Sequence, residues 1–449
     1  FIVRVEDTDR TRYNAEAVPD LVASLRWLGL DWDEGPEVGG EYGPYYQSER
    51  LELYHKYAKQ LVDEGHAYYC YCSSDRLTNL REQQLARKET VGYDRHCRNL
   101  TAAQRAEYEA HGITPVVRLK VPLHGQTSFD DVLYGTITVQ NETLDDLVLL
   151  KSDGFPTYHL GVVVDDHLMK ISHIMRGDEW LPSVPKHVLL YNAFGWNIPV
   201  FAHLPLILAP TGKGKLSKRH GGVEVREFRR QGYLPEAMVN YLARVGWSYD
   251  DKTEIFSQDE LVRVFDLSGV NNSPGRFSYE RLESMNAYYI RQLKPDDLAR
   301  RLVPFLQQEG IQAETTDLVP LVPLIQERLK TLSDAVDWID FFFREPAAVQ
   351  ADQLVGKKMT ASQSLEALQY ARDTLRALPD FQVETIDGAL RGLAEELGLK
   401  VGQLLGSVRV AVSGKAVAPP LFETLSILGR ERTLSRIDRG IETLSESKD

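Results

Sequence analysis

The sequence predicts a multidomain protein in which an α/β domain, interrupted by a small α+β insertion, is followed by an all-α region. An apolar, strand-like run at residues 1–5 leads into leucines at helical spacing, and this order begins an α/β unit. Between residues 66 and 150, short strand-like runs separated by proline and glycine indicate the insertion. Beyond residue 224, strand signals fade and helical segments follow one another. The 449 residues are enough for about three domains.

The first half alternates between strand and helix patterns. Leu21, Leu25 and Leu28 recur at helical spacing, and Gly29 stands where it would cap that helix. The apolar run at residues 162–164 is typical of a buried parallel strand and ends in two aspartates. The other elements expected here are helices over 49–64, after 70–72 and over 182–194, and strands over 116–121, 136–139 and 200–208. This order favours a doubly wound sheet interrupted by an inserted domain. In the second half we expect helices over 235–246, 258–265, 295–309 and 318–332.

Composition excludes several classes of protein. The net charge of −13, from 52 basic and 65 acidic residues, argues against a protein that coats nucleic acid over its whole surface. A local basic face can still bind nucleic acid within an acidic total. The sequence has no apolar run near the roughly 20 residues of a membrane span and no signal peptide, and its three cysteines are too few for a disulfide framework. We therefore expect a cytoplasmic protein that does not bind membranes.

The sharpest local feature is a loop at residues 212–220 with two glycines and four cations within seven residues. A mobile cationic loop after a sheet strand can close over a polyphosphate and stabilise charge as pyrophosphate leaves. Composition alone also allows a solvated basic surface loop.

The specific residues of this loop indicate more than its composition does. Residues 215–219, Lys-Leu-Ser-Lys-Arg, resemble the "KMSKS" loop of class I aminoacyl-tRNA synthetases, in the variant of the glutamyl and glutaminyl branch. Further segments resemble that branch in the same order, at residues 1–9, 35–36, 46–50, 153–160, 164–167 and 176–180. Residues 402–403 and 408–414 resemble the terminal domain of the bacterial glutamyl enzymes.

The resemblance implies a Rossmann-type catalytic domain and tRNA-binding domains around it. Its boundaries would be 1–65 with 151–223 for the catalytic domain, 66–150 for an inserted acceptor-stem-binding domain, 224–292 for a stem-contact domain, and 293–370 and 371–449 for two helical anticodon-binding domains. The implied activity is a glutamate–tRNA ligase that forms glutamyl-adenylate and transfers the acyl group to tRNA(Glu). The implied partners are L-glutamate, tRNA(Glu) and ATP with Mg²⁺, and we expect a monomer.

The resemblance also assigns site residues. Glu6 would bind the amino group of glutamate, and Tyr158 and Arg176 its carboxylates; a charge-assisted Arg fork suits that task. Residues alone also allow Glu6 to be a surface acid at a strand end, although the carboxyl edge of a sheet is where ligands bind. The ATP site would use Glu179, Trp180 and Lys218, and the catalytic loop would contribute Lys215, Ser217, Lys218 and Arg219. Tryptophan is also common in protein cores, so Trp180 could instead be a core residue.

Two further assignments concern metal and tRNA. Cys70, Cys72 and Cys97 share one short stretch and resemble the zinc site of some bacterial glutamyl enzymes. Where those have a histidine two residues past the last cysteine, this chain has Asn99, so the fourth ligand is missing and a metal-free three-thiol cluster stays open.

Arg328 aligns with an arginine that selects the anticodon base distinguishing tRNA(Glu) from tRNA(Gln), and a phosphate contact is the alternative.

One family motif is absent. The "HIGH" motif should precede Phe1 by about 20 residues, so we expect a sequence that lacks its N-terminal segment. Three other functions stay open: a glutaminyl-tRNA synthetase, whose C-terminal half is β-barrel, the short paralogue that glutamylates queuosine, and a non-catalytic RNA-binding or regulatory protein descended from a synthetase.

Overall fold

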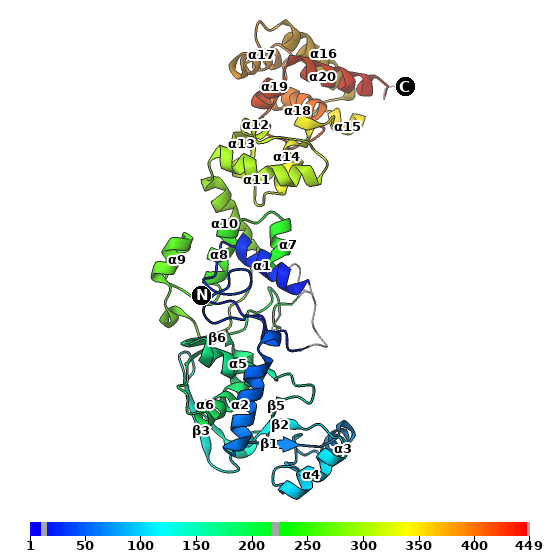
Figure 1. Cartoon of the computed structure of the whole chain (residues 1–449). Coiled ribbons are helices and arrows are strands. Elements are labelled where there is room, and N and C mark those ends of the chain that lie inside the picture. The colour runs from blue at the N-terminus through cyan, green and yellow to red at the C-terminus, as the bar shows by residue number, and fades with distance from the viewer. Residues whose placement is uncertain (10–15, 213, 218–223, 447–449) are drawn as a thin grey trace. The chain divides into compact units, whose positions relative to one another are not determined.

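The computed structural model describes residues 1–9, 16–212, 214–217 and 224–446. The chain forms two compact units, Phe1–Val223 with Val239–Phe277, and Glu224–Met238 with Ser278–Asp449. The first unit mixes strands and helices, and the described part of the second is helical, as the sequence predicts (Figure 1). The finer domain boundaries stay predictions. Among the described residues, no helix is both long enough and apolar enough to cross a membrane.

The first unit contains two sheets and the helices that pack on them. Its helices are α1 (Ala17–Trp27), α2 (Leu51–Asp63), α3 (Ser74–Ala86), α4 (Ala102–Ala110), α5 (Tyr158–Leu168), α6 (Val184–Ala193) and α9 (Gln258–Val264), with short 3₁₀ turns η1 (Gln47–Glu49), η2 (Asn141–Thr143), η3 (Asp178–Ser183) and η5 (Leu267–Gly269). Its strands are β1 (Ala67–Cys70), β2 (Val116–Leu119), β3 (Gln126–Asp131), β4 (Gly135–Gln140), β5 (Val148–Leu150), β6 (His173–Gly177) and β7 (Val200–Leu204).

The larger sheet carries the candidate site. Its order is β4-β3-β7-β6, with β6 and β7 parallel and β3 and β4 antiparallel. Strand β3 also pairs in parallel with β7, where Asp131 is opposite Phe201. Strands β3 and β4, which the sequence places in the insertion, therefore extend the sheet that β6 and β7 form. The smaller sheet, β1-β2-β5, is antiparallel.

A glycine follows each of the first two helices, as predicted for the first. Helix α1 ends at Trp27, and Gly29 follows with a φ of +69°. Helix α2 ends at Asp63, and Gly65 follows with a φ of +81°. Left-handed backbone of this kind suits glycine, which has no Cβ to clash with the preceding carbonyl.

The strand predicted at residues 162–164 is wrong, because these residues lie in helix α5. Thr157 adopts an extended conformation at the N-cap, and the valines are at most 5 % exposed. The helix buries every residue from Leu160 to Asp166, so its apolar residues do not recur every third or fourth position. A short run of valines cannot distinguish a buried strand from a buried helix.

Two other expectations also need correction. Residues 1–5 form no regular strand and make isolated bridges instead, from Ile2 to Glu34 and from Val5 to Tyr46, because these neighbours are irregular. The helix expected over 318–332 is broken into α12 (Thr315–Leu318), α13 (Val322–Ile325) and the 3₁₀ turn η6 (Gln326–Arg328). Pro320 and Pro323 lie within this stretch, and proline removes a helix hydrogen bond and clashes with the preceding turn.

The second unit is a set of packed helices. It contains α7 (Val225–Arg230), α10 (Tyr279–Gln292), α11 (Pro295–Gln308), α14 (Asp334–Phe343), α15 (Ala351–Leu354), α16 (Ala361–Ala377), α17 (Val383–Glu396), α18 (Val401–Ser413), α19 (Leu421–Leu428) and α20 (Arg430–Glu446), while α8 (Pro235–Arg244) belongs partly to each unit. Fully buried leucines and isoleucines such as Leu302, Leu368, Leu390 and Ile437 form one continuous core.

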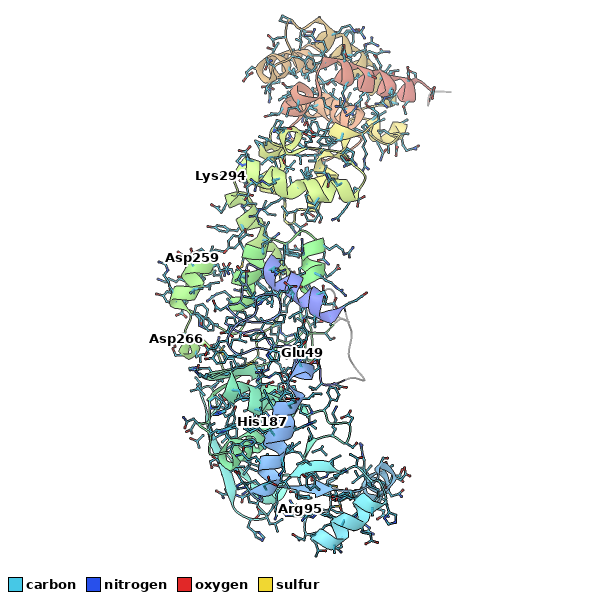
Figure 2. The ribbon with its side chains drawn as sticks, in the orientation of Figure 1. Glu49, Arg95, His187, Asp259, Asp266 and Lys294 are labelled. Atoms are coloured by element: carbon cyan, nitrogen blue, oxygen red, sulfur yellow. The ribbon has the colours of Figure 1, made fainter. Side chains whose placement is uncertain are left out.

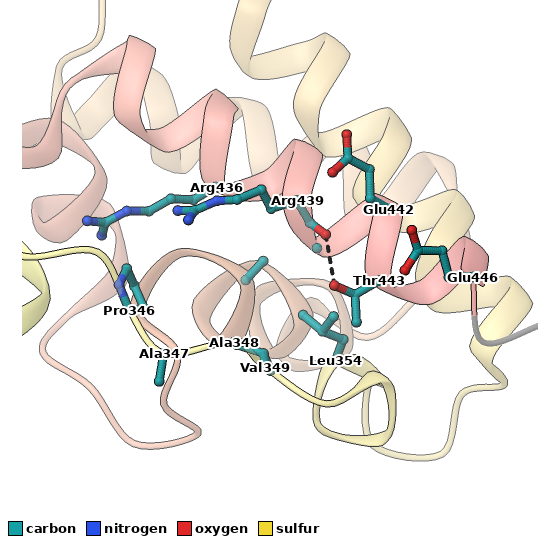
Figure 3. A pocket seen from close by; sticks show the side chains of 12 residues that line it. Pro346, Ala347, Ala348, Val349, Leu354, Arg436, Arg439, Glu442, Thr443 and Glu446 are labelled. Atoms are coloured by element: carbon teal, nitrogen blue, oxygen red, sulfur yellow. Dashed lines mark hydrogen bonds between the residues drawn. The ribbon is translucent and has the colours of Figure 1, made fainter.

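A cavity of about 320 Å³ opens beside α20, between Pro346 and Glu446 (Figure 3). The buried Arg436 borders it and donates from Nη1 to the carbonyl of Val412, at 2.9 Å, and from Nη2 to that of Phe341, at 2.8 Å. Arg436 therefore joins α20 to α18 and α14.

Candidate active site

A buried carboxylate on α5 organises the floor of the site. The Asp165 side chain is fully buried and accepts hydrogen bonds from Arg50 Nε at 2.8 Å, Tyr54 hydroxyl at 2.8 Å and Gln47 Nε2 at 2.9 Å. These donors come from η1, the start of α2 and its first turns. A buried charge is tolerated when its oxygens are paired in this way.

The N-terminal segment is anchored to the same helix through Arg4. Its Nη1 donates to Asp166 at 2.9 Å, and its Nη2 donates to Glu6 at 3.1 Å. Burial acts to lower the pKa of Arg4, but Asp166, Glu6 and Asp165 together raise it above its ordinary value. Glu6 is thus held by a cation while its side chain stays 37 % exposed. The exposed part of its carboxylate is open to solvent.

Tyr158 and Arg176, which the sequence assigns to one substrate, are in contact. Arg176 Nη1 donates to the Tyr158 hydroxyl at 2.8 Å. The buried Nη2 of Arg176 has no hydrogen-bond partner among the described residues. Burial raises the pKa of Tyr158, while the Arg176 charge opposes this shift and the Glu6 charge adds to it. The three residues therefore lie within electrostatic reach of one another.

Trp180 covers this pair. Its ring centroid is 4.6 Å from that of Tyr158, and the Arg176 guanidinium lies 5.8 Å from the Trp180 ring. Trp180 is 39 % exposed, so the interpretation as a core residue is not supported.

Behind Arg176 lies a polar cluster that the sequence does not reveal. Arg176 Nε donates to His203 Nε2 at 3.0 Å, and His203 Nδ1 lies 2.7 Å from Asp131 Oδ2. A second pair, His159 Nδ1 and His187 Nε2, is 2.9 Å apart; His187 belongs to α6 (Figure 2). Burial lowers the pKa of His159 to about 4 and lowers that of His187 well below its ordinary value. These histidines are neutral near pH 7.

The start of the cationic loop meets the predicted ATP site. Lys215 Nζ lies 2.6 Å from Glu179 Oε1, and this hydrogen bond lowers the pKa of Glu179. The loop base is held by hydrogen bonds to its backbone carbonyls: the Ala209 N–H donates to that of Gly214, and the Arg276 side chain donates from Nη1 to that of Gly212 at 2.9 Å. Ser217 follows within the described chain. Lys218 and Arg219, also predicted to be catalytic, lie outside the described residues.

The three cysteines form a compact group. Their sulfur atoms all lie within 4.8 Å of one another, and Cys72 Sγ is 3.5 Å from Cys97 Sγ. The hydroxyl of Tyr93 is 3.2 Å from Cys70 Sγ and 3.5 Å from Cys72 Sγ. Hydrogen bonds from Cys72 and Cys97 lower the pKa of the Cys70 thiol. Tyr93 is a fourth group near the sulfur atoms. The sequence does not reveal it, because the resemblance places the fourth ligand after Cys97 and Tyr93 precedes Cys97.

Arg328 lies far along the chain, at the end of η6 in the second unit. Its guanidinium is 5.3 Å from the ring of Trp338. It borders a cavity of about 580 Å³ whose charged lining residues are Glu280, Glu283, Arg291, Glu327, Arg328 and Lys330.

Two family matches identify this chain, whose mixed sheet carries Arg176 and is followed by a helical region, as a class I aminoacyl-tRNA synthetase. The family described as "tRNA synthetases class I (E and Q), catalytic domain" matches residues 1–284. The family described as "Anticodon binding domain" matches residues 297–441.

Individual relatives narrow the class. A glutamate–tRNA ligase of Dehalococcoides mccartyi is 51 % identical over 99 % of this chain and 91 % of its own length. That of Borreliella afzelii is 46 % identical over 97 % of this chain and 90 % of its own. The crystal structure of the Elizabethkingia meningosepticum glutamate tRNA ligase in complex with its amino acid superposes with a TM-score of 0.88 at 34 % identity, covering 99 % of this chain and 93 % of that one. The chain belongs to the glutamate–tRNA ligases.

The Asp165 network generates a stability prediction. Asp165→Ala should leave the guanidinium of Arg50, which is 3 % exposed, without its carboxylate. Loss of one partner of a buried ion pair typically costs about 3–5 kcal/mol. We expect hydrogen exchange of the α2 and α5 amides under native conditions to show local destabilisation of this size.

The matched control is Asp63→Ala, which removes an exposed partner of Lys59 on the same helix. Exposed pairs contribute about 0–1 kcal/mol, so this variant should exchange like the wild type. Equal exchange in both variants would show that Asp165 does not organise the site.

Proposed function

We propose that this protein activates L-glutamate with ATP and transfers the glutamyl group to the 3′-terminal adenosine of tRNA(Glu). The observation that carries the proposal is the presence of opposite charges in one site, where Arg176 Nη2 has no partner among the described residues and Glu6 is partly exposed. A guanidinium suits a carboxylate of glutamate, and a carboxylate suits its ammonium group. An amino acid with a second carboxylate complements this pattern of charges.

The reaction follows two displacements. The α-carboxylate oxygen of glutamate attacks the α-phosphorus of ATP and pyrophosphate leaves, giving glutamyl-adenylate. A ribose hydroxyl of the terminal adenosine then attacks the acyl carbon, AMP leaves and the hydroxyl proton is released. Neither step requires a side chain as general base, because positioning and charge stabilisation supply most of the acceleration.

The chain's own residues would stabilise the leaving pyrophosphate. Lys215 would exchange its Glu179 partner for a phosphate oxygen, with Lys218 and Arg219 following it in the loop. Mg²⁺ bound to ATP would supply further positive charge on the phosphates. Trp180 lies over Tyr158, where it can separate the amino acid from solvent.

The proposal predicts that Lys215→Ala lowers the rate of ATP–pyrophosphate exchange by about 10²-fold, as loss of one charge-stabilising donor typically does. The KM for glutamate should change less than about threefold, because Lys215 does not contact the glutamate site. Exchange is measured in the full-length protein with tRNA(Glu) present, and Lys218→Ala should have the larger effect.

Lys59→Ala is the control, because Lys59 is 66 % exposed on α2 and pairs with Asp63. It should exchange at the wild-type rate. If the wild-type protein shows no exchange with glutamate, ATP and tRNA(Glu), the chain is a synthetase-derived protein without catalysis.

We also propose that Cys70, Cys72, Cys97 and Tyr93 hold one zinc ion. Tetrahedral zinc with bonds of about 2.3 Å to sulfur places its ligand sulfurs about 3.8 Å apart. The 3.5 Å between Cys72 and Cys97 is close to that spacing, and the Tyr93 hydroxyl, 3.2 Å from Cys70 Sγ and 3.5 Å from Cys72 Sγ, would supply the fourth ligand. Bound zinc would stabilise the segment that joins β1 to α3.

Purified protein should contain about one zinc per chain by mass spectrometry of the metal content. Cys97→Ser should abolish this, and Tyr93→Phe should keep the packing but release zinc at lower chelator concentrations. Protein grown with added zinc that contains none would leave a metal-free three-thiol cluster as the correct interpretation.

We propose that Arg328 selects tRNA(Glu) over tRNA(Gln). Its guanidinium stacks near Trp338 at the border of a cavity, where a base could be read by paired N–H donors. A bidentate contact of this kind discriminates between bases by about 1–3 kcal/mol, roughly 5- to 150-fold.

Charging assays with both tRNAs test this selection on the wild type and on Arg328→Gln. Wild type should charge tRNA(Glu) alone, and the variant should lose selectivity by the factor above. Arg291→Gln is the control, since Arg291 lines the same cavity. If Arg328→Gln weakens both tRNAs alike, Arg328 contacts phosphate and selectivity lies elsewhere.

A further inference from the structure

Three neighbouring strands place an acid, a histidine and an arginine in one line. Arg176 on β6 is directly opposite His203 on β7 in the parallel register. Asp131 ends β3, where it pairs with Phe201, two residues before His203. The side chains of His203 and Asp131 are fully buried. The three side chains therefore form a row from the buried Asp131 through His203 to the Arg176 guanidinium in the proposed glutamate site.

The hydrogen bonds fix the direction of every proton in this line. Asp131 Oδ1 accepts from the backbone N–H groups of Leu133 and Tyr134, and Oδ2 accepts from the N–H of His203. A carboxylate with these donors accepts the ring Nδ1–H of His203 at 2.7 Å. Nε2 then has a free electron pair, which accepts Arg176 Nε–H at 3.0 Å.

The charge state agrees with that geometry. Burial lowers the pKa of His203, although its hydrogen bond to Asp131 acts in the opposite direction. A neutral ring is what this arrangement needs, because a protonated Nε2 would point a hydrogen at Arg176 Nε–H.

We propose that Asp131 and His203 are positioning residues that set the amino-acid specificity of the site by fixing the rotation of the Arg176 guanidinium. With Nε held by His203 and Nη1 by Tyr158, the planar group is restrained from turning, and the buried Nη2, which has no partner among the described residues, is the donor left for the substrate carboxylate. This inference rests on the proposed role of Arg176 in binding glutamate. It adds two residues that do not touch the substrate but determine how well Arg176 binds it.

Two substitutions of His203 separate its two nitrogen atoms. Asparagine can offer an N–H where Nδ1 stands, so it keeps the bond to Asp131 but has no atom at the place of Nε2. Glutamine is longer, and its side-chain oxygen can reach the place of Nε2 and accept from Arg176. His173→Asn, on an exposed position of β6, is the matched control.

The assay is ATP–pyrophosphate exchange in the full-length protein with tRNA(Glu), measuring the KM for glutamate and for ATP, with thermal unfolding of each variant. We expect His203→Asn to raise the KM for glutamate about 10-fold or more while the KM for ATP stays within twofold. His203→Gln should recover at least a third of the lost affinity, and His173→Asn should behave like the wild type.

Arg176→Lys identifies which proposal fails if the result differs. If Arg176→Lys leaves the KM for glutamate unchanged, Arg176 does not bind glutamate and the proposed function of this residue is wrong. If Arg176→Lys raises that KM but His203→Asn does not, the positioning role is overturned while the role of Arg176 stands. Equal losses in His203→Asn and His203→Gln, with both KM values raised in step with a lower Tm, would show that His203 merely supports the fold.

Discussion

The buried carboxylate of Asp165 is the interaction on which the rest of the catalytic unit depends. It joins η1 and α2 to α5, and the neighbouring Asp166 holds Arg4 of the N-terminal segment. Residues 1–9 make isolated bridges and no continuous ladder, so these ion pairs add to the backbone hydrogen bonds of Val3 and Val5 in holding the segment. Arg4 pairs with both Asp166 and Glu6, so a charge buried more than 150 residues later in the sequence helps to position Glu6.

The need to pair buried charges explains why the buried ions of this unit join distant segments. Each buried carboxylate must be paired, and each pairing ties together segments that are distant in sequence. Asp146, which precedes β5 of the smaller sheet, follows this pattern too, since its fully buried side chain accepts from Arg98 at 2.8 Å and from Tyr68 at 2.8 Å. In irregular segments, paired buried charges thus hold together parts of the chain that strand pairing holds together in the sheets.

Sequence patterns predicted the parts of the molecule that are encoded locally. Gly29 follows the first helix, and the two motifs at residues 153–160 and 176–180 pointed to Tyr158 and Arg176, which the structure brings into contact. The valines of α5 gave the wrong element because a helix buried on all sides has no polar face to mark its period. Asp131 and His203 gave no signal, since they are 72 residues apart and meet because β3 joins the sheet of β7.

Burial favours the neutral forms of the histidines and of Tyr158 in the proposed glutamate site. Burial lowers the pKa of His159 to about 4 and that of His203 below its ordinary value, and it raises the pKa of Tyr158. At neutral pH the histidines consequently add no positive charge beside Arg176, and the Tyr158 phenol keeps its proton. If Arg176 and Tyr158 bind the substrate carboxylate as proposed, the guanidinium supplies positive charge beside it, and the phenol accepts from Arg176 while it donates its own hydrogen to a substrate oxygen. A carboxylate satisfies both donors, whereas a carboxamide brings hydrogens of its own and leaves the guanidinium charge uncompensated. In this proposal, discrimination between glutamate and glutamine would come from charge and from the direction of the hydrogen bonds.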